Sequence, residues 1–134
     1  LFWRGSLFED ERRPGEIFFD TRIVRVTEAL LYCGRLYSAL GLDRLRVVSI
    51  HVRHVGLKER RLTSASPARS LSVQSPSAEN ESDASISVRL EQIETDLVGL
   101  VKMILAPLFA LFDFFELNDS VYEDIVSKFV KGKV

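Results

Sequence analysis

Residues 97–115, LVGLVKMILAPLFALFDFF, decide the fold of this chain, because nineteen residues carry only two charges, Lys102 and Asp113. A run this apolar must be buried in the protein's own core, against a partner, or in a bilayer. On a helix that turns about 100° per residue, the two charges lie within roughly 20° of each other. Gly99 and Ala106 fall near the same line. This pattern favours a core helix with one strip facing water, and a partner interface or a bilayer is the alternative.

The proline inside this run, Pro107, predicts a kink or a break, because it has no N–H and its ring clashes with the preceding turn. A further helix is predicted after the run. Ser120 and Glu123 have the spacing of a capping box, and Gly132 can end the helix.

The N-terminal part of the chain predicts a β-hairpin followed by a helix. Residues 1–8 and 16–19 are rich in aromatic and branched side chains, with a polar turn between them. Asp20 or Thr21 can cap the helix, and Gly41 can end it. Its apolar residues recur three and four positions apart, at Ile23, Val26, Leu30, Cys33, Tyr37 and Leu40.

Two strands are predicted in the middle of the chain, separated by a segment rich in serine. Residues 45–55 alternate between apolar and polar side chains, with Val48, Ile50 and Val52 on one face and Ser49, His51 and Arg53 on the other. A second alternating stretch, residues 86–90, is expected to pair with it. Residues 63–85 hold eight serines and two prolines, which predicts a flexible loop with a possible short strand at 70–73.

The order β-β-α-β-(β)-β-α-α predicts an α+β, two-layer fold in which helices pack on one face of an antiparallel sheet. Its 134 residues, 46% hydrophobic and 28% charged, are typical of one globular domain spanning residues 1–134. Without an initiator methionine, the chain is expected to be a fragment of a larger protein. Its single cysteine, Cys33, suits a reducing compartment, so a cytoplasmic location is predicted.

Positive charge gathers in the first half of the chain, although the net charge is −1. Residues 1–61 hold twelve Lys and Arg against eight Asp and Glu, and the excess concentrates between Arg44 and Arg61. Such a segment can contact an anion or a nucleic acid. The candidate contact residues are Arg46, His51, Arg53, Lys58, Arg60 and Arg61. No aromatic residue lies among them to stack bases, which weakens the nucleic-acid hypothesis.

Metal, cofactor and catalytic sites are not predicted. His51 and His54 resemble half of a metal site, but an odd separation on a strand points their rings to opposite faces. No glycine-rich phosphate loop is present in the sequence. Cys33 lies on an apolar helix face, where a thiol behaves as a small hydrophobe. The acidic residues at 91, 94 and 96 are expected to charge the start of a helix near residue 95.

The succession GEIFFDTRIVRVTEALLYCGRLYSALGLDRLRVVSIHVRHVGLKERRL, a serine-rich gap, then SISVRLEQIETDLVGLVKMILAPLFALFDF covers about residues 15–115. It resembles the C-terminal accessory region that follows the Schlafen-AlbA-type domain in some bacterial ATP-binding proteins. The resemblance implies that nucleotide or nucleic-acid chemistry belongs to a missing N-terminal domain, and it carries over no functional residue.

The sequence therefore predicts a non-enzymatic accessory domain of a larger cytosolic protein, with any catalysis in a missing domain. We expect it to mediate self-association, sensing or contact with a protein partner, without a cofactor and without membrane contact. The alternative is a nucleic-acid-binding module that uses residues 44–61.

Overall fold

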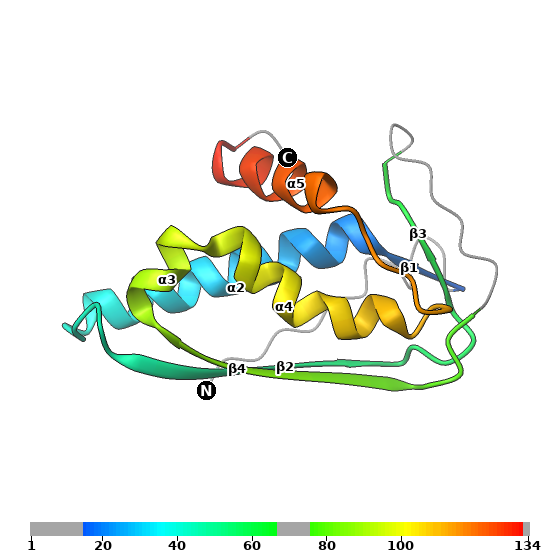
Figure 1. Cartoon of the computed structure of the whole chain (residues 1–134), viewed down its shortest axis with the longest axis horizontal. Helices are drawn as coiled ribbons and strands as arrows, with labels where there is room; N and C mark the ends of the chain where they lie inside the picture. The colour runs from blue at the N-terminus through cyan, green and yellow to red at the C-terminus, as the bar shows by residue number, and fades with distance from the viewer. Residues whose placement is uncertain (1–14, 67–75, 133–134) are drawn as a thin grey trace.

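The computed structural model describes residues 15–66 and 76–132. Within them the chain forms an α+β fold, as predicted, with helices packed against a small antiparallel sheet (Figure 1). The elements are β1 (Glu16–Phe18), α2 (Phe19–Ala39), β2 (Val47–Val55), β3 (Arg61–Thr63), β4 (Glu81–Arg89), α3 (Leu90–Thr95), α4 (Leu97–Ala110) and α5 (Asp119–Val130).

The long antiparallel pair β2–β4 confirms the predicted pairing of the two central strands. All nine residues of each strand pair without a change of register, from Val47 opposite Arg89 to Val55 opposite Glu81. The second strand begins at Glu81, five residues before the predicted start. Its first inward-facing residues are Ser82 and Ala84, which are too small or too polar to produce an apolar alternation in the sequence.

A second, shorter pairing was not predicted. β1 and β3 run parallel, with Glu16 opposite Arg61 and Phe18 opposite Thr63. The residues 1–8 of the predicted hairpin, and the possible strand at 70–73, lie outside the described residues. The segment between the strands is shorter than the predicted loop 63–85, because Thr63 ends β3 and residues 81–85 belong to β4.

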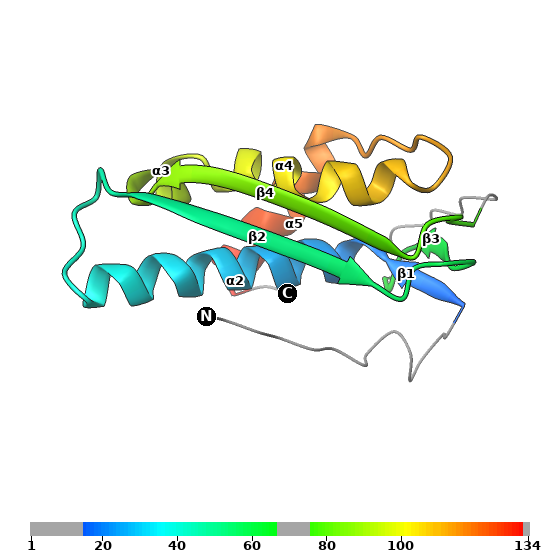
Figure 2. The same ribbon diagram turned by 90° about the horizontal axis from the view of Figure 1, so that it is seen from below.

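All the described helices lie on one side of the β2–β4 ribbon. Figure 2 views the ribbon from its outer face, with β2 toward α2 and β4 toward α4. In Figure 1, α2 and α4 form the layer next to the ribbon, and α5 lies across them on the side away from the strands. The opposite face of the ribbon carries no helix in the part of the chain that the structure describes.

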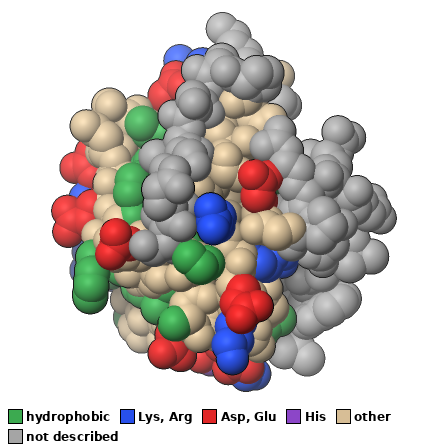
Figure 3. All heavy atoms as spheres, turned by 90° about the vertical axis from the view of Figure 1, so that its right-hand side faces the viewer, with side chains coloured by type: hydrophobic (Ala, Val, Ile, Leu, Met, Phe, Trp, Pro, Cys, Tyr) green, Lys and Arg blue, Asp and Glu red, His purple; other side chains and the backbone are tan. Residues whose placement is uncertain are grey.

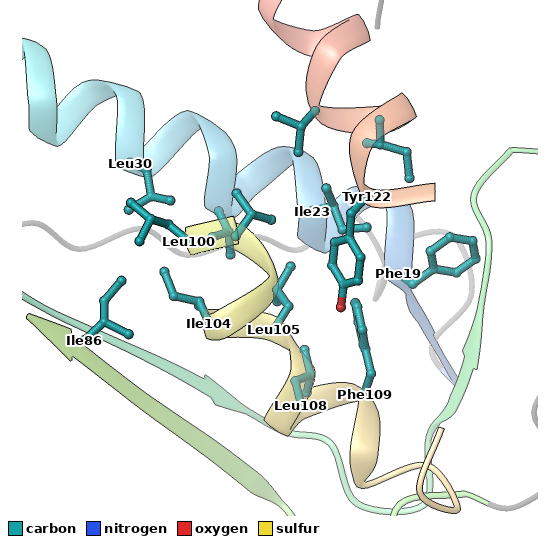
Figure 4. Close-up of a cluster of buried hydrophobic side chains, with 14 of the residues drawn as sticks. Phe19, Ile23, Leu30, Ile86, Leu100, Ile104, Leu105, Leu108, Phe109 and Tyr122 are labelled. Carbon is teal, nitrogen blue, oxygen red and sulfur yellow. The ribbon is translucent and has the colours of Figure 1, made fainter. Parts of the chain in front are cut away.

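The hydrophobic core is built around α4, which confirms the predicted core helix (Figure 4). Lys102 and Ala106 lie on its exposed strip. Phe109 is buried and its ring packs against Tyr122 of α5, with the ring centroids 6.2 Å apart. The buried residues of α4 are Leu100, Val101, Ile104, Leu105, Leu108 and Phe109. No described helix is both long enough and apolar enough to cross a membrane.

The break predicted at Pro107 does not occur, since α4 continues to Ala110. The carbonyl deprived of its partner by Pro107 belongs to Met103, whose side chain is exposed, so water can reach that turn. The helix ends at Ala110, so Asp113, which was expected on its exposed strip, lies beyond it in a turn, where Asp113 and Phe114 have positive φ angles of 59° and 56°.

Three helix starts differ from the predictions. α2 begins at Phe19, so Asp20 lies in its first turn instead of capping it. α5 is capped by Asn118, whose side chain accepts a hydrogen bond from the N–H of Ser120, and the predicted capping box is wrong. The helix expected to start near residue 95 is two helices, α3 and α4, separated at Asp96. The predicted ends are confirmed, because Gly41 and Gly132 follow α2 and α5 with positive φ angles of 82° and 73°.

Candidate functional site

The outward side chains of β2 and β4 form one polar surface, which we call the outer ribbon face. On β2 it carries Ser49, His51 and Arg53, as the alternation predicted, and all three are exposed. These residues lie opposite Ser87, Ser85 and Asp83 of β4. Two candidate contact residues, His51 and Arg53, therefore share this face.

Both of these candidate residues are already paired with carboxylates of the same chain. The Nε2 atom of His51 lies 2.9 Å from Oδ1 of Asp83. Arg53 donates from Nη2 to Oε1 of Glu81 at 2.6 Å, and its Nε lies 4.0 Å from Oδ1 of Asp83. The hydrogen bond that Arg53 donates to Glu81 and the negative charge of Glu81, with a smaller contribution from Asp83, raise the pKa of Arg53. A phosphate approaching this face would meet two carboxylates beside the arginine.

The other four candidates lie beyond the two ends of β2. Arg46 precedes the strand, whereas Lys58, Arg60 and Arg61 follow it. A strand of nine residues at about 3.3 Å each separates these two groups by roughly 30 Å. The guanidinium of Arg60 donates to the carbonyl of Gly56 at 3.3 Å. The structure therefore does not bring the six candidates into one site.

The end of the molecule that carries β1 and β3 shows basic and acidic side chains intermixed (Figure 3). No continuous basic surface appears among the described residues in that view. Protein surfaces that bind nucleic acid gather Lys and Arg on one face. The described surface at this end lacks that feature.

His54 faces the opposite side of the ribbon from His51, as the odd separation predicted. Its imidazole is buried, and Nδ1 lies 2.9 Å from Nη1 of Arg22 on α2. Burial, with a further contribution from the charge of Arg22, lowers the pKa of His54 to about 4. The ring is therefore neutral at pH 7. Within the described residues, no group of three or more His, Cys, Asp or Glu side chains could hold a metal ion.

The carboxylate of Asp20 is buried and surrounded by hydrogen-bond donors, which the sequence did not predict. We call these contacts the Asp20 cluster. Oδ1 of Asp20 accepts hydrogen bonds from the N–H of Ala65 at 2.9 Å and of Thr21 at 3.0 Å. Oδ2 accepts from the hydroxyl of Ser64 at 2.8 Å and from the N–H of Ser66 at 3.2 Å. Asp20 therefore fastens the start of the serine-rich segment to α2, and its oxygens are occupied by donors instead of free for catalysis.

The only cysteine, Cys33, does not form a reactive site. Its side chain is partly buried in α2, and burial raises the pKa of the thiol. A raised pKa lowers the fraction of thiolate, which is the nucleophilic form. The structure thus agrees with the prediction that Cys33 is a small hydrophobic residue.

No family model matches this chain, and no curated protein or solved structure shows significant similarity to it. The resemblance to the region that follows Schlafen-AlbA-type domains stays a prediction.

Proposed function

We propose that this chain is a non-enzymatic accessory domain that mediates self-association within a larger cytosolic protein. In this proposal any catalysis belongs to another domain of that protein, as the resemblance to the accessory region of bacterial ATP-binding proteins implies. The observation that carries the proposal is the open edge of β2. In the part of the chain that the structure describes, β2 has a single neighbouring strand, β4.

An open edge of this kind pairs readily with another strand, because its unpaired N–H and C=O groups form a template. Natural proteins protect such edges with charged side chains, above all lysine, and with proline, bulges, very short strands or a covering helix or loop. β2 contains no lysine or proline, and its nine residues pair with β4 without a bulge.

Apolar side chains are exposed at both ends of this edge. Val47 is 61% exposed and Val55 is 54% exposed. Leu40 and Leu45, between α2 and β2, are also exposed. Burying apolar surface contributes about 25 cal/mol per Å², so these residues favour association.

The proposal is tested by measuring the mass of the full chain against concentration in sedimentation experiments. We expect the average molecular mass to rise with concentration. As the mass rises, we expect amide hydrogen exchange in Val47–Val55 to become slower. The double variant Val47→Lys/Val55→Lys should stay monomeric, since lysine on an edge strand opposes pairing. Met103→Lys, which changes an equally exposed residue of α4, is the matched control and should associate like the natural chain. A chain that stays monomeric at every accessible concentration contradicts the proposed function.

A further inference from the structure

The connection between α2 and β2, residues 40–46, forms one tip of the molecule, at the end opposite β1 and β3 (Figures 1 and 2). We propose that this tip binds the surface of an anionic lipid bilayer. Leu40 and Leu45 enter the headgroup region, and the arginines beside them meet the lipid phosphates. The inference does not rest on the proposed function, and it replaces the expectation that the chain makes no membrane contact.

Apolar side chains gather at this tip. Leu40 is 65% exposed and Leu45 is 61% exposed. Leu36 is exposed as well, and it lies four positions before Leu40, so the two side chains share one face at the end of α2. An exposed leucine that occurs singly needs no explanation, whereas a cluster of them marks a site of contact with a partner or a membrane.

Hydrogen bonds hold the turn in a conformation that leaves these leucines outside. Oδ1 of Asp43 accepts from the N–H of Leu45 at 2.7 Å, and the carbonyl of Asp43 accepts from the N–H of Arg46 at 2.9 Å. The carbonyl of Arg46 accepts from the N–H of Leu90 at 3.0 Å, which fastens the turn to α3. Leu42, in contrast, packs against the core. The turn therefore presents Leu45 without the cost of ordering a loop.

Three arginines lie beside these leucines in the sequence. Arg35, Arg44 and Arg46 are exposed, and none of them makes an ion pair with another described residue. The single acidic residue between positions 35 and 47 is Asp43. Basic side chains next to a membrane are attracted by the negative charge of anionic lipids. Leucines flanked by arginines therefore complement a surface that is negatively charged outside and apolar beneath.

The small size of the tip favours a bilayer over a protein partner. A stable protein interface buries about 800 Å² on each side, which is more than a turn of a few residues offers. A bilayer sets no such threshold, because each apolar side chain that enters it contributes through its own buried area. Each basic residue near an anionic surface adds about fivefold in affinity. A short turn with two leucines and nearby arginines can therefore bind lipid.

Acidic side chains near the turn belong to α3. This helix is set back from the tip in both views (Figures 1 and 2). Its first acidic residue, Glu91, already pairs with Arg89, with 3.3 Å between Oε1 and Nε. The attraction of the tip to anionic lipid therefore depends on Arg44 and Arg46, which belong to the turn itself.

The exposed strip of α4 and the turn after it form the competing apolar surface. Met103 and Phe114 are exposed there. Lys102 is paired with Asp119, and Asp113 precedes Phe114. The charge of this surface is negative, so an anionic bilayer does not attract it. We therefore assign lipid binding to the tip and use α4 as the control.

The inference is tested by co-sedimentation of the full chain with lipid vesicles. Vesicles of phosphatidylcholine and phosphatidylserine in equal amounts should bind the chain at low salt, and added salt should weaken the binding. Vesicles of phosphatidylcholine alone should bind it at least about tenfold more weakly.

Two pairs of variants locate the contact. Leu40→Ser/Leu45→Ser should weaken binding by at least about tenfold, because the apolar surface that enters the bilayer is lost. Met103→Ser/Val130→Ser, which changes two similarly exposed apolar residues of α4 and α5, is the matched control and should bind like the natural chain.

The charge of the tip is tested in the same way. Arg44→Gln/Arg46→Gln should weaken binding about twentyfold and reduce its dependence on salt. Arg53→Gln/Lys128→Gln changes the net charge equally, but at residues paired with Glu81 and Asp124, and should have a much smaller effect. Circular dichroism verifies that each variant keeps the fold.

A polarity-sensitive fluorophore provides a direct measurement of insertion. In a Cys33→Ser background, the label on Leu45→Cys should become brighter and shift to shorter wavelength when anionic vesicles are added. The same label on Met103→Cys, an exposed residue of α4, should not respond.

The outcomes decide between lipid and other partners. Absence of binding to anionic vesicles at low salt overturns the inference, and so does binding that neither the leucine nor the arginine variant weakens. If vesicles do not bind but Leu40→Ser/Leu45→Ser lowers the average mass at high concentration, these leucines belong to self-association instead. A chain that binds anionic vesicles through the tip and stays monomeric in solution supports the inference and contradicts only the proposed function.

Discussion

The buried imidazole of His54 should make the stability of this domain depend on pH between 7 and 5. The side chain is 8% exposed and faces the guanidinium of Arg22 across 2.9 Å. Within the described residues, its Nε2 atom is buried without a hydrogen-bond partner. A protonated ring would therefore place a second cation beside Arg22 in a poorly solvated site, and this is why the pKa of His54 falls to about 4.

The sign and the size of the effect follow from the two pKa values. In the unfolded chain the pKa of histidine is about 6.5. Between pH 6.5 and 4 the unfolded chain binds a proton that the folded chain does not, so the free energy of unfolding falls as the pH falls. The full loss amounts to about 3 kcal/mol at roughly 1.4 kcal/mol per pKa unit. The part that appears between pH 7 and pH 5 is about 2 kcal/mol.

The assay is urea unfolding at pH 7, 6 and 5, with the natural chain compared with His54→Gln. Glutamine does not titrate in this range, and its carbonyl can accept a hydrogen bond from Arg22. We expect the variant to lose about 2 kcal/mol less stability than the natural chain between pH 7 and pH 5. Ser49→Gln is the control, because it places the same amide on the exposed outer ribbon face, leaves His54 unchanged and should keep the pH dependence. Parallel stability curves for the natural chain and His54→Gln would refute the reasoning.

Four further predictions test the core, the exposed strip of α4, the Asp20 cluster and the charge pairing. Ile104→Asp should unfold the domain, as measured by circular dichroism, because it buries an unpaired charge in the core. Lys102→Gln should change the unfolding free energy by less than about 0.5 kcal/mol, since its pair with Asp119 is exposed. Asp20→Asn should cost about 1–3 kcal/mol in urea unfolding, because an amide cannot accept from every donor around it. Duplex DNA should not bind detectably at low salt, and micromolar binding that weakens steeply with added salt would instead support the nucleic-acid alternative.

The features that the sequence predicted correctly depend on local periodicity. The apolar run around Ile104 became the centre of the core, and the alternation in residues 45–55 placed His51 and His54 on opposite faces. Helix caps were predicted less well because they depend on neighbours distant in sequence. Aspartate is a common N-cap residue, yet Asp20 accepts a hydrogen bond from Ser64, 44 residues away. No rule based on neighbouring residues predicts that contact.

In the candidate site, too, local patterns were predicted correctly and contacts between distant residues were not. The alternation correctly placed Arg53 on an exposed face, but neither the alternation nor the count of basic residues tells which carboxylate lies beside it. Glu81 and Asp83 belong to a serine-rich stretch that was predicted to be a flexible loop. Once these two residues enter β4, the register places them next to Arg53 and His51. The small inward residues Ser82 and Ala84 concealed the start of this strand, and without the strand the sequence does not show that Arg53 and His51 lie beside carboxylates.

This pairing bears on how the ribbon can meet another chain. Along the outer ribbon face, Arg53 and His51 each contact a carboxylate of the same chain, and the hydroxyl oxygens of Ser49 and Ser87 lie 3.4 Å apart. Stacking a partner on that face would bury these satisfied polar groups without providing better partners. The edge of β2 presents the opposite situation, because a second strand would bond main-chain groups that have no partner strand among residues 15–66 and 76–132. A ribbon that is polar and balanced on its face but unprotected along its edge therefore favours association in the plane of the sheet.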